Sequence, residues 1–189
     1  METNNTLVKS TQNLTLTQRL KLRDRMPCLI LDISGSMCKA VDENIEPDVS
    51  KINKLKEILK SINPLPRFMY TFSSDSNRVS PSDIQDIKPN GSTVLSNALS
   101  LAIQDNQNHC ILITDGEVDP YDRDKSLELC KNLIIDIIYI GPDSKVPDFL
   151  TLLVKNCKQG SFASKADLAS PNLLTEKIQL LLTQGDQYK

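Results

Sequence analysis

Three short polar turns contain the side chains of this 189-residue chain that are best suited to bind a ligand. The first turn places Asp32, Ser34 and Ser36 at alternate positions after an apolar run, and two later turns contribute Thr93 and Asp115. Two carboxylates and three hydroxyls are hard oxygen ligands, and none of the five side chains carries sulfur or imidazole. The set therefore favours Mg²⁺ or Mn²⁺ over zinc and copper, with Ca²⁺ as a weaker alternative.

A cation bound by these oxygens would still need a ligand from outside the chain. Two acids and neutral hydroxyls balance a divalent charge only in part where an acid acts through water, and they leave one coordination position open. A carboxylate of another protein suits both the charge and the geometry, so the ligand set predicts binding through a metal bridge. Gly35, Gly91 and Gly116 lie in the same three turns, and we expect them to shape these loops.

Short apolar strands alternate with stretches of helical periodicity along the chain. We expect strands at residues 26–33, 67–72, 110–114 and 134–140, with weaker strands at 77–80 and 161–163. We expect helices at residues 51–62, after Gly91-Ser92, and at 125–133, 147–157 and 172–182. Ser50 is the expected N-cap of the first helix, and residues 39–49 are expected to form a polar loop.

This alternation predicts one doubly wound α/β domain, with a mostly parallel, Rossmann-like sheet and helices on both faces. Ligands bind such sheets at the carboxyl ends of the strands, where the strand order changes direction. The three polar turns follow strands or precede helices at that edge, so the fold would bring their side chains together. We assign residues 21–189 to the domain and residues 1–20 to a polar N-terminal tail.

The composition of the chain indicates which kinds of partner it binds and in which cellular compartment it works. The chain has 22 Lys and Arg against 24 Asp and Glu, for a net charge of -2, and therefore lacks the basic excess of a nucleic-acid binder. No apolar run is long enough to cross a membrane, and the polar N-terminus lacks the apolar core of a signal peptide. Five scattered cysteines suit reduced thiols. We expect a cytoplasmic protein that binds neither membrane nor nucleic acid.

The motif Asp32-x-Ser34-x-Ser36, followed in order by Thr93 and Asp115, resembles the metal-ion-dependent adhesion site of von Willebrand factor A (vWA) domains. The resemblance covers almost the whole chain after about residue 20. It implies a strand order of 3-2-1-4-5-6 with one antiparallel edge strand. It also implies that Ser34 and Ser36 bind the metal directly, and that Asp32, Thr93 and Asp115 bind it directly or through water. Ser92 departs from the family, in which many members have a second glycine.

The resemblance also implies a class of partner. Without a signal sequence or paired cysteines, the chain looks like the stand-alone intracellular vWA proteins of bacteria and phages. Members of that group often work with AAA ATPases of the MoxR type or in tellurite-resistance-associated complexes. We therefore expect a protein partner that supplies a Glu or Asp side chain, with a MoxR-type ATPase as one candidate.

Enzymatic alternatives require groups that the chain lacks at the necessary positions. His109 is the only histidine and begins the strand that ends near Asp115. About 20 Å of extended chain would separate it from the turns, so we expect a surface or strand-entry residue and no Ser–His mechanism. A phosphohydrolase with Asp32 as nucleophile would need a second acid at the position of Ser34. We therefore expect no catalytic residues.

A structural function is an alternative to partner binding through the metal. In that case the protein would be a subunit of a larger assembly, such as a phage particle, and the metal would do no more than stabilise the loops.

An acidic run follows the third turn, and we expect a mostly solvated segment with a lesser role in repelling acidic surfaces. Its members are Glu117, Asp119, Asp122 and Asp124.

Overall fold

The computed structural model describes residues 15, 17, 26–42, 46–116 and 118–184. Apart from Thr15 and Thr17, the tail predicted at residues 1–20 lies outside the described residues, as do residues 21–25 at the predicted start of the domain.

Six strands form the central sheet, in the spatial order β5-β4-β1-β6-β7-β8. The edge strand β5 is antiparallel to β4, and all other neighbours are parallel. Counted along the chain, these six strands have the order 3-2-1-4-5-6 that the resemblance implied. Their bounds are β1 (Cys28–Asp32), β4 (Met69–Phe72), β5 (Ser76–Val79), β6 (His109–Thr114), β7 (Ile134–Tyr139) and β8 (Phe162–Lys165).

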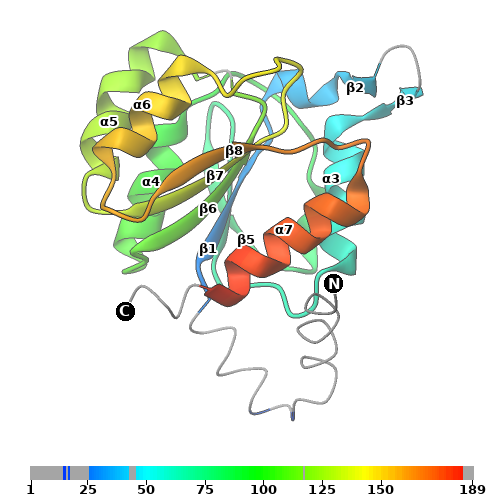
Figure 1. Cartoon of the computed structure of the whole chain (residues 1–189), viewed down its shortest axis with the longest axis horizontal. Coiled ribbons are helices and arrows are strands. Elements are labelled where there is room, and N and C mark those ends of the chain that lie inside the picture. Colours follow the sequence, from blue (N-terminus) through cyan, green and yellow to red (C-terminus); the bar gives the residue numbers. More distant parts are fainter. Residues whose placement is uncertain (1–14, 16, 18–25, 43–45, 117, 185–189) are drawn as a thin grey trace, which may run out of the picture.

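In the described residues, five α-helices cover the two faces of this sheet (Figure 1). One face carries α3 and α7, and the other carries α4, α5 and α6. The predicted doubly wound α/β class is therefore confirmed. The bounds are α3 (Lys51–Ser61), α4 (Leu95–Gln104), α5 (Arg123–Cys130), α6 (Asp148–Asn156) and α7 (Pro171–Gln184).

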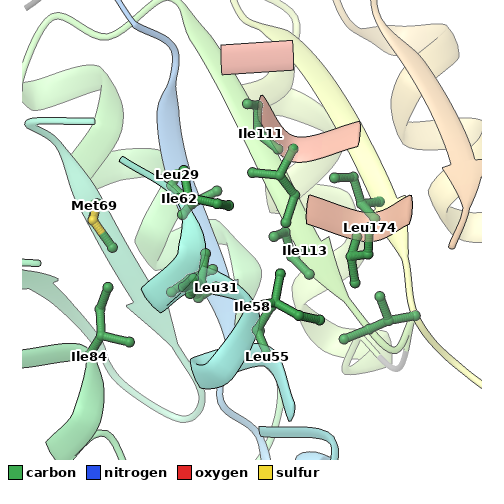
Figure 2. Packing of buried hydrophobic residues seen from close by; sticks show 14 of the residues in the cluster. Leu29, Leu31, Leu55, Ile58, Ile62, Met69, Ile84, Ile111, Ile113 and Leu174 are labelled. Carbon is green, nitrogen blue, oxygen red and sulfur yellow. The ribbon is translucent and has the colours of Figure 1, made fainter. Parts of the chain in front are cut away.

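The buried strand β1 divides the hydrophobic core into two halves. Its alternate side chains point to opposite faces of the sheet, as a period of two requires. Leu29 and Leu31 join the cluster under α3 and α7, and Figure 2 shows Leu29 near Ile62 and Leu31 near Ile58. Cys28 and Ile30 join the cluster under α4, α5 and α6. Burial on both faces explains why β1 is apolar until its last residue.

Helix α3 begins and packs as its sequence predicts. The Ser50 hydroxyl accepts a hydrogen bond from the Asn53 amide at 3.4 Å, which makes Ser50 the N-cap. The apolar positions Ile52, Leu55 and Ile58 recur at helical spacing and are buried against the sheet. The amide of Lys51, the first residue of α3, donates to the Lys39 carbonyl at 3.0 Å, which ties this end of the helix to the loop after β1.

The expected polar loop at residues 39–49 is wrong. The chain forms an antiparallel hairpin there, in which β2 (Ala40–Asp42) pairs with β3 (Glu46–Ser50). The sequence AVDENIEPDVS has little β-propensity and contains a proline, so local pattern gave no sign of a strand. The hairpin leads directly into α3, because Ser50 ends β3 and caps the helix.

The chain connections place a switch point between β1 and β6. From β1 the chain continues through α3 to β4 on one side, whereas from β6 it continues through α5 to β7 on the other. The carboxyl ends of β1 and β6 lie side by side, since Leu31 is paired with Ile113. Asp32 ends β1, and Asp115 directly follows β6, so both acids lie at the position where such sheets bind ligands.

Candidate functional site

Asp32 is fully buried at the carboxyl end of β1, and both of its oxygens accept hydrogen bonds. The Ser34 amide donates to Oδ1 at 2.8 Å, and the Thr114 hydroxyl donates to Oδ2 at 2.6 Å. Burial and the nearby charge of Asp115 raise the pKa of Asp32 to about 6, although these hydrogen bonds favour the ionised form. A positive charge at this position would remove that penalty.

A chain of hydrogen bonds joins the two serines to the second acid. The Ser36 hydroxyl donates to Asp115 Oδ1 at 3.0 Å. Because a hydroxyl has one proton, Ser34 is the donor in the 3.0 Å contact between the hydroxyls of Ser34 and Ser36. The predicted residues Asp32, Ser34, Ser36 and Asp115 are thus brought together, although 79 positions separate Ser36 from Asp115.

Lys51 is a member of this site that the sequence analysis did not identify. Its Nζ lies 2.8 Å from Asp115 Oδ2, and both side chains are buried. Lys51 is the first residue of α3, where the positive end of the helix dipole disfavours a cation. A lysine at the first position of a helix that follows an acidic loop was the available signal.

Thr93 is held close by, through its backbone. Its amide donates to Asp119 Oδ2 at 3.1 Å, and the Asp119 amide donates to the Thr93 carbonyl at 3.1 Å. In the part of the chain that the structure describes, no hydrogen bond links the Thr93 hydroxyl to Asp32, Ser34, Ser36 or Asp115. The structure therefore fixes the Thr93 loop without connecting its side chain to the other predicted ligands.

The three glycines predicted to shape the loops do so in different ways. Gly91 and Gly116 have φ angles of +65° and +95°, and a Cβ at Gly91 would lie 2.3 Å from Ser74 Oγ. Gly35 differs, since its φ is not positive and it lies in the short 3₁₀ helix η1 (Gly35–Cys38). Its amide donates to the Gly91 carbonyl at 3.0 Å, which ties the first loop to the second.

Part of the acidic run is structural, which corrects the expectation that it is mostly solvated. Asp122 is 3% exposed and accepts hydrogen bonds from the Ser96 amide and the Ser126 hydroxyl, both at 2.9 Å. Burial by itself would raise the pKa of Asp119, but hydrogen bonds, first among them that of the Thr93 amide, hold it below its usual value. Asp124 is exposed, and Glu117 lies outside the described residues.

His109 is a buried strand-entry residue. It begins β6, at the end opposite Asp115, and its Nε2 lies 2.7 Å from Asp136 Oδ2 on β7. The alternative of a surface position is wrong, because its exposure is 7%. The length of β6 separates this imidazole from both serines of the site.

Comparison with known proteins connects this architecture to a family fold. No protein-family model and no curated protein sequence matches the chain. Among solved structures, the SpRpn10 VWA domain superposes with a TM-score of 0.57 at 15% identity, covering 78% of this chain and 94% of that one. The chain has a vWA-like fold.

Two bacterial structures resemble the chain over a similar length. An aerotolerance-related membrane protein from Bacteroides fragilis, with multiple mutations to serines, gives a TM-score of 0.59 at 15% identity and covers 86% of this chain and 98% of its own. The conserved hypothetical protein BatB from Bacteroides thetaiotaomicron gives 0.55 at 14% identity, with 82% and 97% covered. At these identities the likeness establishes the fold of the vWA-like chain. In its described residues, no helix is long and apolar enough to span a membrane.

The spacing of the oxygens at this edge of the sheet is compatible with the coordination geometry of a magnesium ion. In octahedral coordination at about 2.1 Å, neighbouring ligand oxygens lie about 3.0 Å apart. The two hydroxyl contacts that join Ser34, Ser36 and Asp115 are each 3.0 Å. The described residues contain no cluster of three or more His, Cys, Asp or Glu side chains that could hold a metal, so the hydroxyls would have to serve as ligands.

Proposed function

We propose that the chain is a metal-dependent protein-interaction module. In this proposal Asp32, Ser34, Ser36, Thr93 and Asp115 hold Mg²⁺ or Mn²⁺, and a Glu or Asp side chain of a protein partner completes the coordination. The observation that carries the proposal is the continuous set of oxygens from Ser34 through Ser36 to Asp115, beside the buried carboxylate of Asp32.

The accessibility of the ligands supports an approach from outside. Asp32 and Ser34 are buried, whereas Ser36 is partly exposed. A cation at these oxygens would therefore contact the buried residues at the carboxyl end of β1 on one side and solvent, beside Ser36, on the other. Once bound, the ion supplies a positive charge that attracts a carboxylate, and the chain's own residues orient that charge toward the partner.

The proposal assigns no reaction to the site. The position two residues after Asp32 is Ser34, which cannot act as the general acid of an aspartate-based phosphatase. His109 lies at the far end of β6 from the serines, so a Ser–His mechanism has no base within reach. The site brings oxygens together without a general acid or a histidine base beside them, and this supports a binding function over a catalytic one.

We place the protein in the cytoplasm and expect it to bind neither nucleic acid nor membrane. All five cysteines are free, which supports a reducing compartment. The near-neutral charge of -2 supports a protein partner over a polyanion. By the family resemblance, a MoxR-type AAA ATPase of a bacterial or phage-infected cell is a candidate partner.

Mn²⁺ titration followed by the relaxation of water protons tests this function with the metal alone. We expect binding at millimolar Mn²⁺ and an enhanced relaxation rate, because the open coordination position would carry an exchanging water. Adding acetate as a carboxylate probe should lower that enhancement by displacing the water. No binding with or without acetate would contradict the proposed function, and enhancement insensitive to acetate would contradict the open position.

A further inference from the structure

The ligand set proposed above does not explain the buried contact between Lys51 and Asp115. Lys51 is only 6% exposed and Asp115 only 5%, so the Nζ–Oδ2 ion pair of 2.8 Å is shielded from water. A buried ammonium is costly unless a carboxylate pairs with it, and the N-terminus of α3 adds a further unfavourable positive potential. Asp115 is thus the group that makes the position of Lys51 tolerable.

The two carboxylate oxygens of Asp115 have different partners. Its Oδ1 accepts from Ser36, on the side of the proposed metal ligands, and its Oδ2 accepts from Lys51, on the side of α3. Among the residues that the structure describes, no other salt bridge involves Asp32 or Asp115. The charge of one carboxylate is therefore shared between the lysine and any cation bound beside the serines.

We propose that Lys51 is a built-in cation that competes with the divalent ion for Asp115 and makes tight metal binding depend on an incoming carboxylate. This deepens the function proposed above and rests on it. Asp32, Asp115 and Lys51 together carry a net charge of -1 when both carboxyls are ionised. A divalent ion brings that charge to +1, and one carboxylate from a partner brings it to zero.

Removal of the ammonium provides the test. In Lys51→Met we expect the Mn²⁺ affinity measured by calorimetry without acetate to rise by at least about tenfold. The further gain in affinity that acetate gives should be smaller than in the wild-type chain, because the bound ion no longer leaves an excess positive charge. Lys51→Arg, which retains the charge, should remain within about threefold of wild type.

A matched control lies on the same helix. Lys60 is exposed at the other end of α3, and Lys60→Met changes the net charge of the chain by the same amount. It should leave the Mn²⁺ affinity unchanged, which separates a local effect from a general one. Thermal unfolding in EDTA provides a second readout: Lys51→Met should have a lower Tm than wild type, and Mn²⁺ should restore it.

The outcomes distinguish this inference from the function beneath it. If wild type binds Mn²⁺ and Lys51→Met binds it no more tightly, the competition is overturned and the metal function stands. If only Lys51→Met binds, the competition is supported and the function of the wild-type chain fails. If neither binds, both are overturned. Should Lys51→Met not fold, the ε-methylene resonance of Lys51 in wild type decides: Mg²⁺ must shift it, and an unmoved resonance at saturation overturns the competition.

Discussion

At the scale of single residues, Asp32 is a buried carboxylate whose lost hydration is only partly compensated by the groups around it. The side chain is fully buried, and its two oxygens accept from the Ser34 amide and the Thr114 hydroxyl. Those two donors compensate only part of the lost hydration, since the pKa of Asp32 remains raised to about 6 by burial and by Asp115. A carboxylate kept under such conditions is well suited to be neutralised by a cation.

Replacement of Asp32 by asparagine tests that interpretation. Asp32→Asn has nearly the same shape and removes the charge, so we expect the Mn²⁺ affinity to fall by at least about tenfold while the fold is retained. Calorimetry gives the affinity, and circular dichroism with thermal unfolding gives the fold. Asp124→Asn, at an exposed position, is the matched control and should bind Mn²⁺ like wild type. Equal affinities in the two variants would remove Asp32 from the site.

The sequence predicts which side chains supply the oxygens of the site better than it predicts that Lys51 pairs with one of them. Asp32, Ser34 and Ser36 are close in the chain and recognisable as a set, and the fold class then brings Asp115 beside them. The contact of Lys51 with Asp115 spans 64 positions and depends on where the first turn of α3 lies relative to β6. The sequence signal, a lysine at the first position of a helix, does not encode that distance, so the pairing of Lys51 with Asp115 is seen only in the structure.

At the scale of elements, Asp122 connects the starts of two helices. Its Oδ2 accepts from the Ser96 amide in the first turn of α4 and from the Ser126 hydroxyl in α5. It thus satisfies a helix N-terminus that has no capping side chain of its own, because Val94 occupies the N-cap position of α4. The loop that carries Thr93 leads into this same helix start.

Asp122→Ala should therefore destabilise the protein. Loss of a buried carboxylate that satisfies a helix N-terminus costs about 2 kcal/mol, or about 4–8 °C in Tm for a chain of this size. Thermal unfolding of Asp122→Ala beside Asp124→Ala gives the comparison, since Asp124 is exposed on the same segment. A Tm drop of equal size in both variants would contradict the role given to Asp122.

The edge strand β5 is attached to α4 by a charged contact that titrates. Arg78 donates to Asp105 from Nε at 2.7 Å and from a terminal guanidinium nitrogen at 3.0 Å, and the Tyr70 hydroxyl donates to the same carboxylate at 2.9 Å. The Arg78 guanidinium, aided by Tyr70, holds the pKa of Asp105 below its usual value despite partial burial.

A lowered pKa in the folded state means that the contact stabilises the fold above the unfolded pKa of about 4 and loses that effect as the pH falls through the folded value. We therefore expect Asp105→Asn to lower the Tm by a few degrees at pH 7, the small size reflecting solvent screening. The Tm difference from wild type should shrink as the pH falls below about 4. A difference that does not change with pH would mean that charge has no part in the contact.

Element boundaries follow the sequence where packing and local pattern agree. The helix expected at residues 51–62 is α3 (Lys51–Ser61), because its apolar face and its N-cap both lie in the local sequence. The hairpin of β2 and β3 was missed, since pairing of Ala40 with Ser50 is specified by the route of the chain into α3 and not by β-propensity. The expected start of the helix after Gly91-Ser92 was early for a similar reason, because Asp122 fixes the beginning of α4 from a distant segment.

At the scale of the whole molecule, the site exists because the sheet changes direction. β1 and β6 are neighbours whose connections leave toward opposite sides, so nothing in the sheet covers their carboxyl ends. Asp32 and Asp115 come from these two strands, and Lys51 comes from the helix that leaves β1 on its way to β4. A cation bound there would join the two halves of the fold, and its effect should extend beyond the loops that touch it.

Metal binding should therefore raise the stability of the full chain. A ligand present at about 100 times its Kd, and bound only by the folded state, stabilises by about 2.7 kcal/mol, which corresponds to about 5–10 °C in Tm for this chain length. We expect the Tm to rise with Mn²⁺ concentration from its value in EDTA, and Asp32→Asn to abolish most of that rise. Calorimetric scans at several Mn²⁺ concentrations measure the effect. A Tm that responds equally in wild type and Asp32→Asn would show that the cation stabilises the molecule at another position, and would separate its effect from the switch point between β1 and β6.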